Sequence, residues 1–194
     1  MVKVAFLILA HCDPVHLERL VKAISHESSI FIHLDKKTHI DEYVHIADIA
    51  SVNFIPERVK VYWGGVSMVK AILNLIKTAL ASEESFSHIV LLSGADYPIK
   101  HVSKFYDFLG NNPGTELMKL VSLSKSPEPR EKRLYNYWFL EPFQTFFDDS
   151  LFRRALQKFF HLMIPRNLPD RMSGQSLAWG SGNWAITSEC ASFI

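Results

Sequence analysis

The stretch HIVLLSGADYPIK, residues 88–100, decides the fold of this chain. It begins with the continuous apolar run Ile89–Leu92, which is typical of a central strand covered on both faces of a sheet. It then passes through a Ser-Gly-Ala turn to Asp96. Ligands of α/β proteins bind beyond the carboxyl ends of the strands. The stretch therefore predicts a buried strand that ends in a functional turn.

Strands and helices alternate on both sides of this stretch. Further strands are predicted at Val2–Leu9, Ser29–Leu34, Val52–Ile55 and Val59–Tyr62. Apolar residues at helical spacing predict helices at Pro14–Ser25, Ser67–Ala81 and Ser103–Leu109, and a short helix or loop at Thr38–Ile46. Ser67 is expected to cap its helix, whose predicted apolar face carries Val69, Ile72, Leu73, Ile76 and Leu80. This order predicts an α/β fold with a mostly parallel sheet flanked by helices on both faces.

The second half of the chain differs in composition. A polar loop is predicted over residues 124–133, and a densely aromatic segment follows over 135–147. A basic amphipathic helix is predicted at Leu151–Met163, and the glycine-rich block Trp179–Thr187 comes after it. The length of 194 residues fits one domain, whose two halves we expect to meet near residue 110.

Charge and cysteine content exclude several classes of protein. The net charge of +1 predicts no broad electrostatic field for nucleic acid. Cys12 and Cys190 form neither a zinc pattern nor a disulfide framework, and no Asp-x-Asp or His-x-x-x-His sequence occurs, so no metal is expected. The apolar run at residues 4–10 is interpreted as a buried strand rather than a signal peptide. No apolar run reaches the roughly 20 residues that span a bilayer.

Polar residues follow the predicted strands. His11 follows the first strand, and Asp35 and Lys37 follow the second. An aspartate there can accept from a nucleotide base or ribose and a lysine can meet phosphate charge, although a solvated turn is the alternative. At Trp63-Gly64-Gly65, glycines can let the backbone approach a ligand beside the start of a helix. A structural turn is the alternative there, because neither a P-loop nor a GxGxxG pattern occurs.

Two carboxylates are candidates for acid–base chemistry. Asp96 is placed at the mouth of the sheet to act as a base or to hold a sugar hydroxyl, with a turn aspartate as the alternative. Glu141 lies among aromatic residues, which would raise its pKa if it is desolvated; the alternative is a surface glutamate beside a core cluster. Tyr97 and Trp138, near these carboxylates in the chain, are candidate substrate contacts.

A third candidate region is the block around Ser181 and Trp184. It combines two tryptophans with small polar residues. Such a block can form a sugar-binding wall. A tight hairpin with core tryptophans is equally compatible with the pattern.

Six blocks occur in order along the chain: FLILAH (6–11), IFIHLDKK (30–37), VYWGGVSMVKAIL (61–73), HIVLLSGADYPIK (88–100), YWFLEPF (137–143) and WGSGNWAIT (179–187). The ordered set resembles the core-2/I-branching β-1,6-N-acetylglucosaminyltransferases and their peptide O-xylosyltransferase relatives. The resemblance implies a GT-A-type nucleotide-sugar-binding fold, a UDP-sugar donor, inversion at the anomeric centre and no metal. It implies a nucleotide-binding half over about residues 1–110 and an acceptor-side half over about 111–194.

The resemblance also implies roles for the candidate residues. Those expected at the nucleotide-sugar are His11, Asp35, Lys37, Trp63, Gly64 and Gly65. Asp96 and Glu141 are expected to face the sugar and the acceptor. The residues expected to contact substrate are Tyr97, Trp138, Ser181 and Trp184.

The chain departs from the family pattern in two places. Asn183, which cannot act as a base, stands where xylosyltransferases carry an aspartate. Family members continue past the last block with an acidic motif and with basic residues that neutralise the diphosphate, so the fold is expected to be truncated at its carboxyl end. The absence of a membrane anchor at the start fits a bacterial relative in the cytoplasm or at the cytoplasmic face of a membrane. A Golgi membrane location is implied if the resemblance to eukaryotic members extends to location.

The resemblance, together with the missing Asp-x-Asp sequence, implies an inverting, metal-independent glycosyltransferase. It would move GlcNAc or xylose from a UDP-sugar to a hydroxyl of a glycan, polysaccharide or protein, without a nucleic-acid partner. Either Asp96 or Glu141 would take the acceptor proton, while the other would hold hydroxyls. The alternative is a catalytically inactive domain that binds a nucleotide-sugar or carbohydrate.

Overall fold

The computed structural model describes residues 2–25, 27–49, 51–122 and 178–194, together with residues 155, 158, 159 and 163. The chain divides into two compact units, one of residues 1–118 and 182–194 and the other of residues 119–181. In the second unit, β5 (Leu120–Ser122) pairs antiparallel with β6 (Ala178–Gly180). Residues 155, 158, 159 and 163 are helical, as predicted for their segment.

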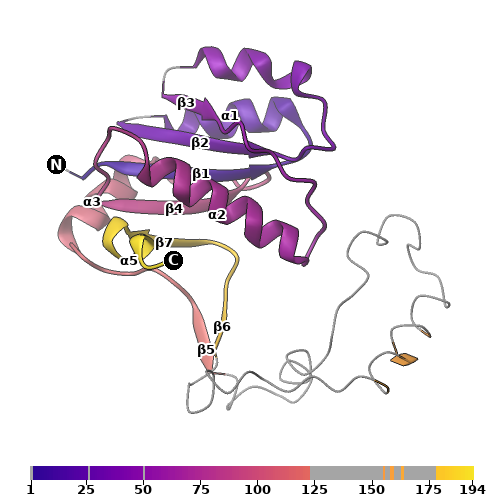
Figure 1. Cartoon of the computed structure of the whole chain (residues 1–194). Coiled ribbons are helices and arrows are strands. Elements are labelled where there is room, and N and C mark those ends of the chain that lie inside the picture. The colour runs from indigo at the N-terminus through magenta and orange to yellow at the C-terminus, as the bar shows by residue number, and fades with distance from the viewer. Residues whose placement is uncertain are drawn as a thin grey trace. The chain divides into compact units, whose positions relative to one another are not determined.

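The first unit is built on a five-stranded sheet in the order β3-β2-β1-β4-β7 (Figure 1). The strands are β1 (Val4–Ala10), β2 (Ser28–Leu34), β3 (Val52–Phe54), β4 (His88–Ser93) and β7 (Trp184–Thr187). The first four are parallel, and β7 runs antiparallel to β4 at one edge. The predicted α/β class with a mostly parallel sheet is therefore confirmed. The edge strand β7 comes from the carboxyl-terminal end of the chain, whereas the other four strands come from its first half.

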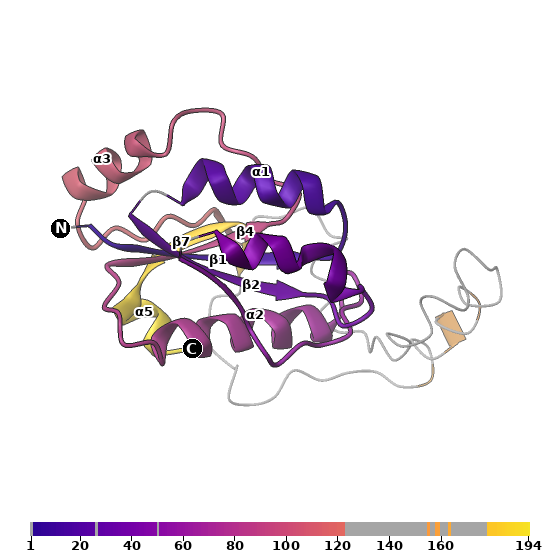
Figure 2. The same cartoon turned by 90° about the horizontal axis from the view of Figure 1, so that it is seen from above.

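Helices cover both faces of this sheet, as predicted (Figures 1 and 2). One face packs against α1 (Pro14–Ile24), the 3₁₀ helix η1 (Ile40–Asp48) and α3 (Ser103–Asn111). The other face packs against α2 (Val66–Leu80) and α5 (Ser188–Ser192). Alternate side chains of β1 pack into the two cores. Phe6 and Ile8 lie in the core on the α1 side, and Ala5 and Leu7 lie in the core on the α2 side. The sheet is thus covered on both faces, which leaves the ends of its strands for the connecting turns.

The buried face of α2 differs from the predicted one. The helix buries Ser67, Ala71, Leu75, Ile76 and Ala79. The predicted burial of Val69, Leu73 and Leu80 is wrong, because these side chains are exposed. Small residues at four-residue spacing let this helix lie close to the sheet, so they take the inner face in place of larger apolar ones. Ser67 is also not the cap, since Gly65 holds that position.

The predicted strand at Val59–Tyr62 is absent from the structure. This segment runs beside the end of β2 and contacts side chains there instead of forming a regular ladder. The amide of Val59 donates to Nε2 of His33 over 2.9 Å, and the amide of Val61 lies 3.4 Å from Oδ1 of Asp35. The amide of Lys36 donates to the Val59 carbonyl over 3.0 Å. The segment therefore forms one wall of the region beyond β2.

Candidate functional site

The turns after β1, β2 and β4 meet at the carboxyl edge of the sheet. Adjacent parallel strands end there at Ala10, Leu34 and Ser93. The amide of Asp35 donates to the Ala10 carbonyl over 2.8 Å, and the amide of Gly94 donates to the Leu9 carbonyl over 2.7 Å. These bonds hold the turns of three strands against one another.

A cavity of about 380 Å³ opens at this edge. Four predicted residues line it: His11, Asp35, Lys37 and Trp63. Residues that the prediction did not include complete the lining, among them His33, Val61, Met68, Ile72, Ser93 and Asn183. Trp63 is 88% exposed, so its indole is accessible to a ligand. The structure thus gathers side chains from separate sequence blocks around one hollow of the size of small-molecule sites.

Asp35 is a buried carboxylate at the end of β2, with 5% of its surface exposed. Its Oδ1 accepts from the amide of Lys37 over 2.8 Å, and its Oδ2 lies 3.5 Å from Nζ of Lys37. A buried charge requires such partners. The alternative of a solvated turn therefore does not hold for Asp35, whose carboxylate is fixed at the cavity wall.

Lys37 connects the two walls of the cavity. Its Nζ donates to the Val61 carbonyl over 2.5 Å and lies 4.7 Å from the centre of the Tyr62 ring. The Tyr62 amide in turn donates to Oγ of Ser67 over 2.8 Å, at the start of α2. The ammonium of Lys37 is therefore held beside the carboxylate of Asp35 and under an aromatic face.

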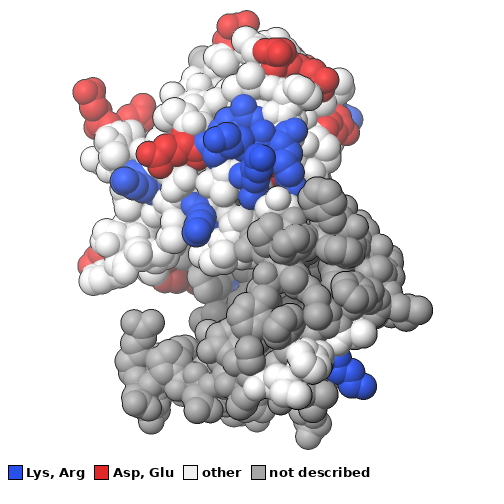
Figure 3. All heavy atoms as spheres, turned by 45° about the vertical axis from the view of Figure 1, so that its right-hand side comes forward, with Lys and Arg blue, Asp and Glu red and all other residues white. Residues whose placement is uncertain are grey.

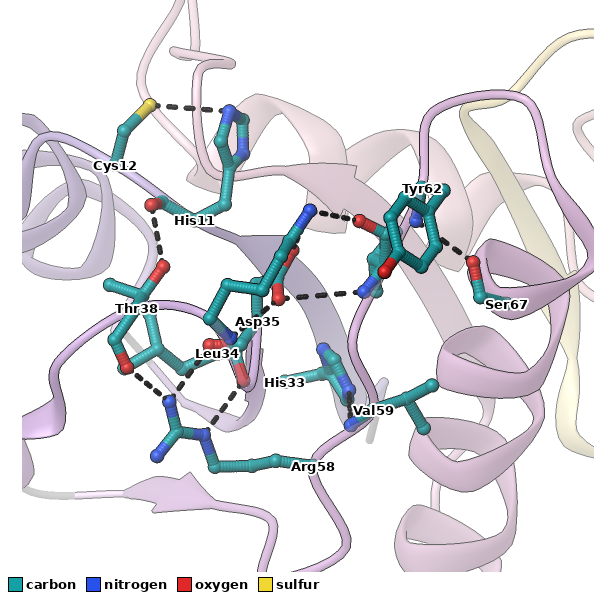
Figure 4. Close-up of polar contacts among 12 residues, drawn as sticks. His11, Cys12, His33, Leu34, Asp35, Thr38, Arg58, Val59, Tyr62 and Ser67 are labelled. Carbon is teal, nitrogen blue, oxygen red and sulfur yellow. Dashed lines mark hydrogen bonds and ion pairs between the residues drawn. The ribbon is translucent and has the colours of Figure 1, made fainter. Parts of the chain in front are cut away.

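Arg58 supports the Asp35 turn from outside the cavity lining. Its guanidinium donates to three backbone carbonyls, those of Leu34, Asp35 and Thr38, over 2.9, 2.8 and 2.6 Å (Figure 4). The sequence analysis missed this residue. Its partners lie 20 to 24 positions away along the chain, and no local spacing points to them. The guanidinium of Arg58 therefore holds in place the backbone turn that carries Asp35.

His33 is a second missed residue of this site. It is 1% exposed, and its Nε2 accepts from the amide of Val59, which places the ring proton on Nδ1. Burial lowers the pKa of His33 below its ordinary value of 6.5. A polar residue inside the otherwise apolar run of β2 was the sequence signal for it. The neutral imidazole fixes the wall formed by residues 59–61.

The lowered pKa of His33 predicts a loss of stability in mild acid. The unfolded chain binds a proton near pH 6.5, while the folded chain resists it, so the free energy of unfolding should fall as pH drops below about 6.5. One such proton changes this free energy by at most about 1.4 kcal/mol per pH unit. Urea unfolding at pH 7.5 and 5.5 measures the loss, which should be smaller in His33→Gln. An equal loss in both proteins would contradict this assignment.

Asp96 is tied into the turn after β4. Its Oδ2 accepts from the amide of Ser93 over 2.7 Å and from Nδ2 of Asn183 over 3.1 Å. Its backbone carbonyl accepts from Nε2 of His16 over 3.1 Å. Ser93 and Asn183 line the cavity, whereas Asp96 itself does not. The carboxylate is therefore bonded to two residues of the cavity wall, and these bonds are those of a turn aspartate.

The remaining predicted residues lie in other places. Gly64, with φ of 71°, and Gly65, the cap of α2, shape the turn before that helix and do not line the cavity. Tyr97 lines a different cavity, and Trp184 packs in part against the core on the α2 side. Ser181 belongs to the second unit. The predicted residues Trp138 and Glu141 lie outside the described residues.

Cations gather at this edge of the first unit. Lys36, Lys37, Arg58 and Lys60 lie on the two segments that meet beside the cavity, and Lys36 and Lys60 are exposed. Figure 3 turns the carboxyl edge of the sheet forward and shows lysine and arginine side chains clustered on that side. Among the residues that the structure describes, no three histidine, cysteine or acidic side chains form a group able to hold a metal ion.

The fold and this edge define an α/β protein with a cavity at the carboxyl ends of its parallel strands and with lysine and arginine side chains on the segments beside it. The family model described as Core-2/I-Branching enzyme matches residues 4–161. The chain therefore belongs to the Core-2/I-Branching enzyme family, as the six sequence blocks predicted.

Several curated proteins are similar to this chain. Xylosyltransferase 2 of Rattus norvegicus is 29% identical and Xylosyltransferase oxt of Drosophila melanogaster is 28% identical, each over 126 residues. Each match covers 61% of this chain and 14% of the relative. A beta-1,3-galactosyl-O-glycosyl-glycoprotein beta-1,6-N-acetylglucosaminyltransferase 4 of Danio rerio is 25% identical over 132 residues, which are 66% of this chain and 31% of the relative. The chain thus spans a small part of the length of these relatives.

A solved 4-diphosphocytidyl-2C-methyl-D-erythritol synthase of Anaerococcus prevotii superposes with a TM-score of 0.44 and 11% identity, over 97% of this chain and 73% of that one. The strand order of the chain itself, rather than this similarity, defines the fold class. In the described part of the chain, no helix combines the length and the apolar character needed to cross a membrane.

Proposed function

We propose that this chain provides the donor site of an inverting, metal-independent glycosyltransferase that moves GlcNAc or xylose from a UDP-sugar to an acceptor hydroxyl. The observation that carries the proposal is the cavity that brings His11, Asp35, Lys37 and Trp63 together in a member of this family. The acceptor would be a hydroxyl of a glycan, polysaccharide or protein.

The nucleotide would bind against the wall formed by Asp35 and Lys37. The Asp35 carboxylate is fixed by backbone and ammonium donors, so a ligand meets an acceptor whose position is already set. The exposed ring of Trp63 offers a flat apolar face to a base or sugar. The neutral ring of His33 keeps the opposite segment in place.

Departure of UDP requires positive charge near its diphosphate. Lys36 and Lys60 are exposed next to the cavity, while Lys37 and Arg58 are engaged in holding its walls. The exposed pair supports a donor site in which lysines rather than a metal meet the diphosphate charge.

Transfer requires a base for the acceptor proton. Asp96 is held at the end of β4 by bonds to Ser93 and Asn183, and it remains one candidate together with Glu141. The bonds that Asp96 makes are also those of a structural aspartate. They favour the second candidate function, a domain that binds a nucleotide-sugar without turning it over.

Binding and turnover measured in excess EDTA test the proposal. We expect UDP to bind the chain in calorimetry with the same affinity in EDTA and in manganese. We also expect UDP release from UDP-GlcNAc or UDP-xylose with a panel of acceptors. Binding that disappears in EDTA and returns with manganese would contradict the metal-independent site. Binding without release on any acceptor would favour the inactive domain.

A further inference from the structure

A second cavity opens on the α1 and α3 face of the first unit. Its volume is about 450 Å³, and its apolar walls come from the sheet and both helices, with Phe6, Leu20, Ile24, Val90, Phe105 and Phe108 among them. The segment that joins β4 to α3 borders it and passes beside α1 (Figure 2). This cavity shares Leu92 with the lining of the donor-site cavity and opens on the other face of the sheet. It is therefore a separate hollow.

The mouth of this cavity is apolar and exposed. Ile99 is 97% exposed, and Tyr97 and Phe108 are 48% and 45% exposed. Soluble domains commonly expose single apolar side chains, but here three of them surround an apolar hollow of the size that small ligands occupy. A ligand that fills the hollow would remove apolar surface from water at the mouth, where Tyr97, Ile99 and Phe108 are exposed, and would contact the buried side chains below it.

Basic side chains surround the same mouth. Lys100 and Lys104 line the cavity, Lys22 lines an adjoining hollow together with Ile99, and the Arg19 guanidinium lies 5.5 Å from the centre of the Tyr97 ring. Lys104 has an acidic neighbour, Asp107, at 3.6 Å, in an exposed pair that holds it weakly.

Acidic groups compete little with these cations. Lys22 contacts Glu18 over 2.6 Å on its own helix. Asp96 is the acidic residue in the described lining, and its carboxylate is bonded to Ser93 and Asn183. The mouth thus favours a ligand with negative charge, whereas the cavity below it favours an apolar chain.

We propose that this cavity binds the alkyl chain of a single-chain anionic amphiphile, with the anionic head at Lys100 and Lys104. The apolar walls hold the chain and the lysines hold the head, so neither part alone should bind well. The proposal does not depend on the donor site or on transferase activity.

Titration calorimetry with dodecyl phosphate, kept below its micelle concentration, tests the proposal on the full chain. Dodecyl phosphate should bind, inorganic phosphate alone should not, and the neutral dodecyl maltoside should bind at least about fivefold more weakly. Lys100→Glu and Phe108→Asp should each weaken dodecyl phosphate binding about tenfold or more. Val69→Asp, an exposed apolar position on the other face of the sheet, is the matched control and should bind normally.

Other outcomes would overturn the proposal. Equal binding of inorganic phosphate would indicate a surface anion site, and equal losses in the control variant would indicate a nonspecific effect. Flotation with phosphatidylglycerol vesicles without binding of the monomeric amphiphile would indicate a bilayer-docking surface instead. Circular dichroism checks the fold of each variant. If Phe108→Asp unfolds, Lys100→Glu still tests the proposal, because Lys100 is exposed and its substitution should leave the fold intact.

Discussion

Replacing Asp96 with asparagine is expected to lower turnover by about 100-fold or more while UDP affinity stays nearly unchanged. Asparagine keeps the volume of the side chain and retains one oxygen that can accept from Ser93 and Asn183. The substitution removes the carboxylate that would take the acceptor proton or hold a hydroxyl. Rates of UDP release at saturating donor, together with calorimetry of UDP binding, measure the two quantities.

Glu141→Gln is the companion variant, because Glu141 is the other candidate base. The variant with the larger loss of turnover identifies the base. Asp41→Asn, at an exposed aspartate of η1, is the control and should retain full activity. If both candidate variants keep near-normal turnover in an active preparation, neither residue is the base. In that case Asp96 has only the structural role that its hydrogen bonds show.

The second large effect is expected at Asp35. Asp35→Asn should weaken UDP binding by about 1–3 kcal/mol, or roughly fivefold to 150-fold. The carboxylate faces the cavity and interacts with Lys37, so its loss changes both the acceptor offered to the nucleotide and the position of the ammonium. Calorimetry of UDP with folded protein measures the effect.

The control for Asp35 separates binding from folding. Thermal unfolding of Asp35→Asn reports how much of the turn depends on the carboxylate, while Asp41→Asn should match the natural chain in both measurements. Unchanged UDP affinity in folded Asp35→Asn would reject the role of this residue at the nucleotide.

Much of the fold could be predicted from apolar patterning. The strand β1 and the centre of β4 are continuous apolar runs, and β2 is largely apolar apart from its two serines and His33. Such runs need helices on both faces of the sheet, which the structure confirms. The buried face of α2 could not be read from periodicity. Large apolar residues such as Val69 and Leu73 follow helical spacing, but the smaller Ala71 and Ala79 lie against the sheet.

The site was predictable where a residue follows its strand directly. His11 and Asp35 stand at strand ends, so the parallel order of β1 and β2 brings them to one edge. Arg58 acts through backbone contacts with a segment distant in sequence, and no spacing indicates such contacts. His33 contacts the distant Val59 amide, and its only sequence signal is that it is polar within the β2 run. The bond between Asp96 and Asn183 joins residues 87 positions apart, and residue order does not specify such a contact.

Nuclear magnetic resonance of the chain titrated with UDP in excess EDTA tests the central claim most directly. If the cavity beyond β1, β2 and β4 is the donor site, the backbone amides that shift should be those of its walls, led by Lys37, Val61 and Asn183. Amides of the second cavity, such as those of Lys104 and Phe108, should stay unchanged. Shifts that cluster away from the carboxyl edge of the sheet, or no shifts at saturating UDP, would contradict the account.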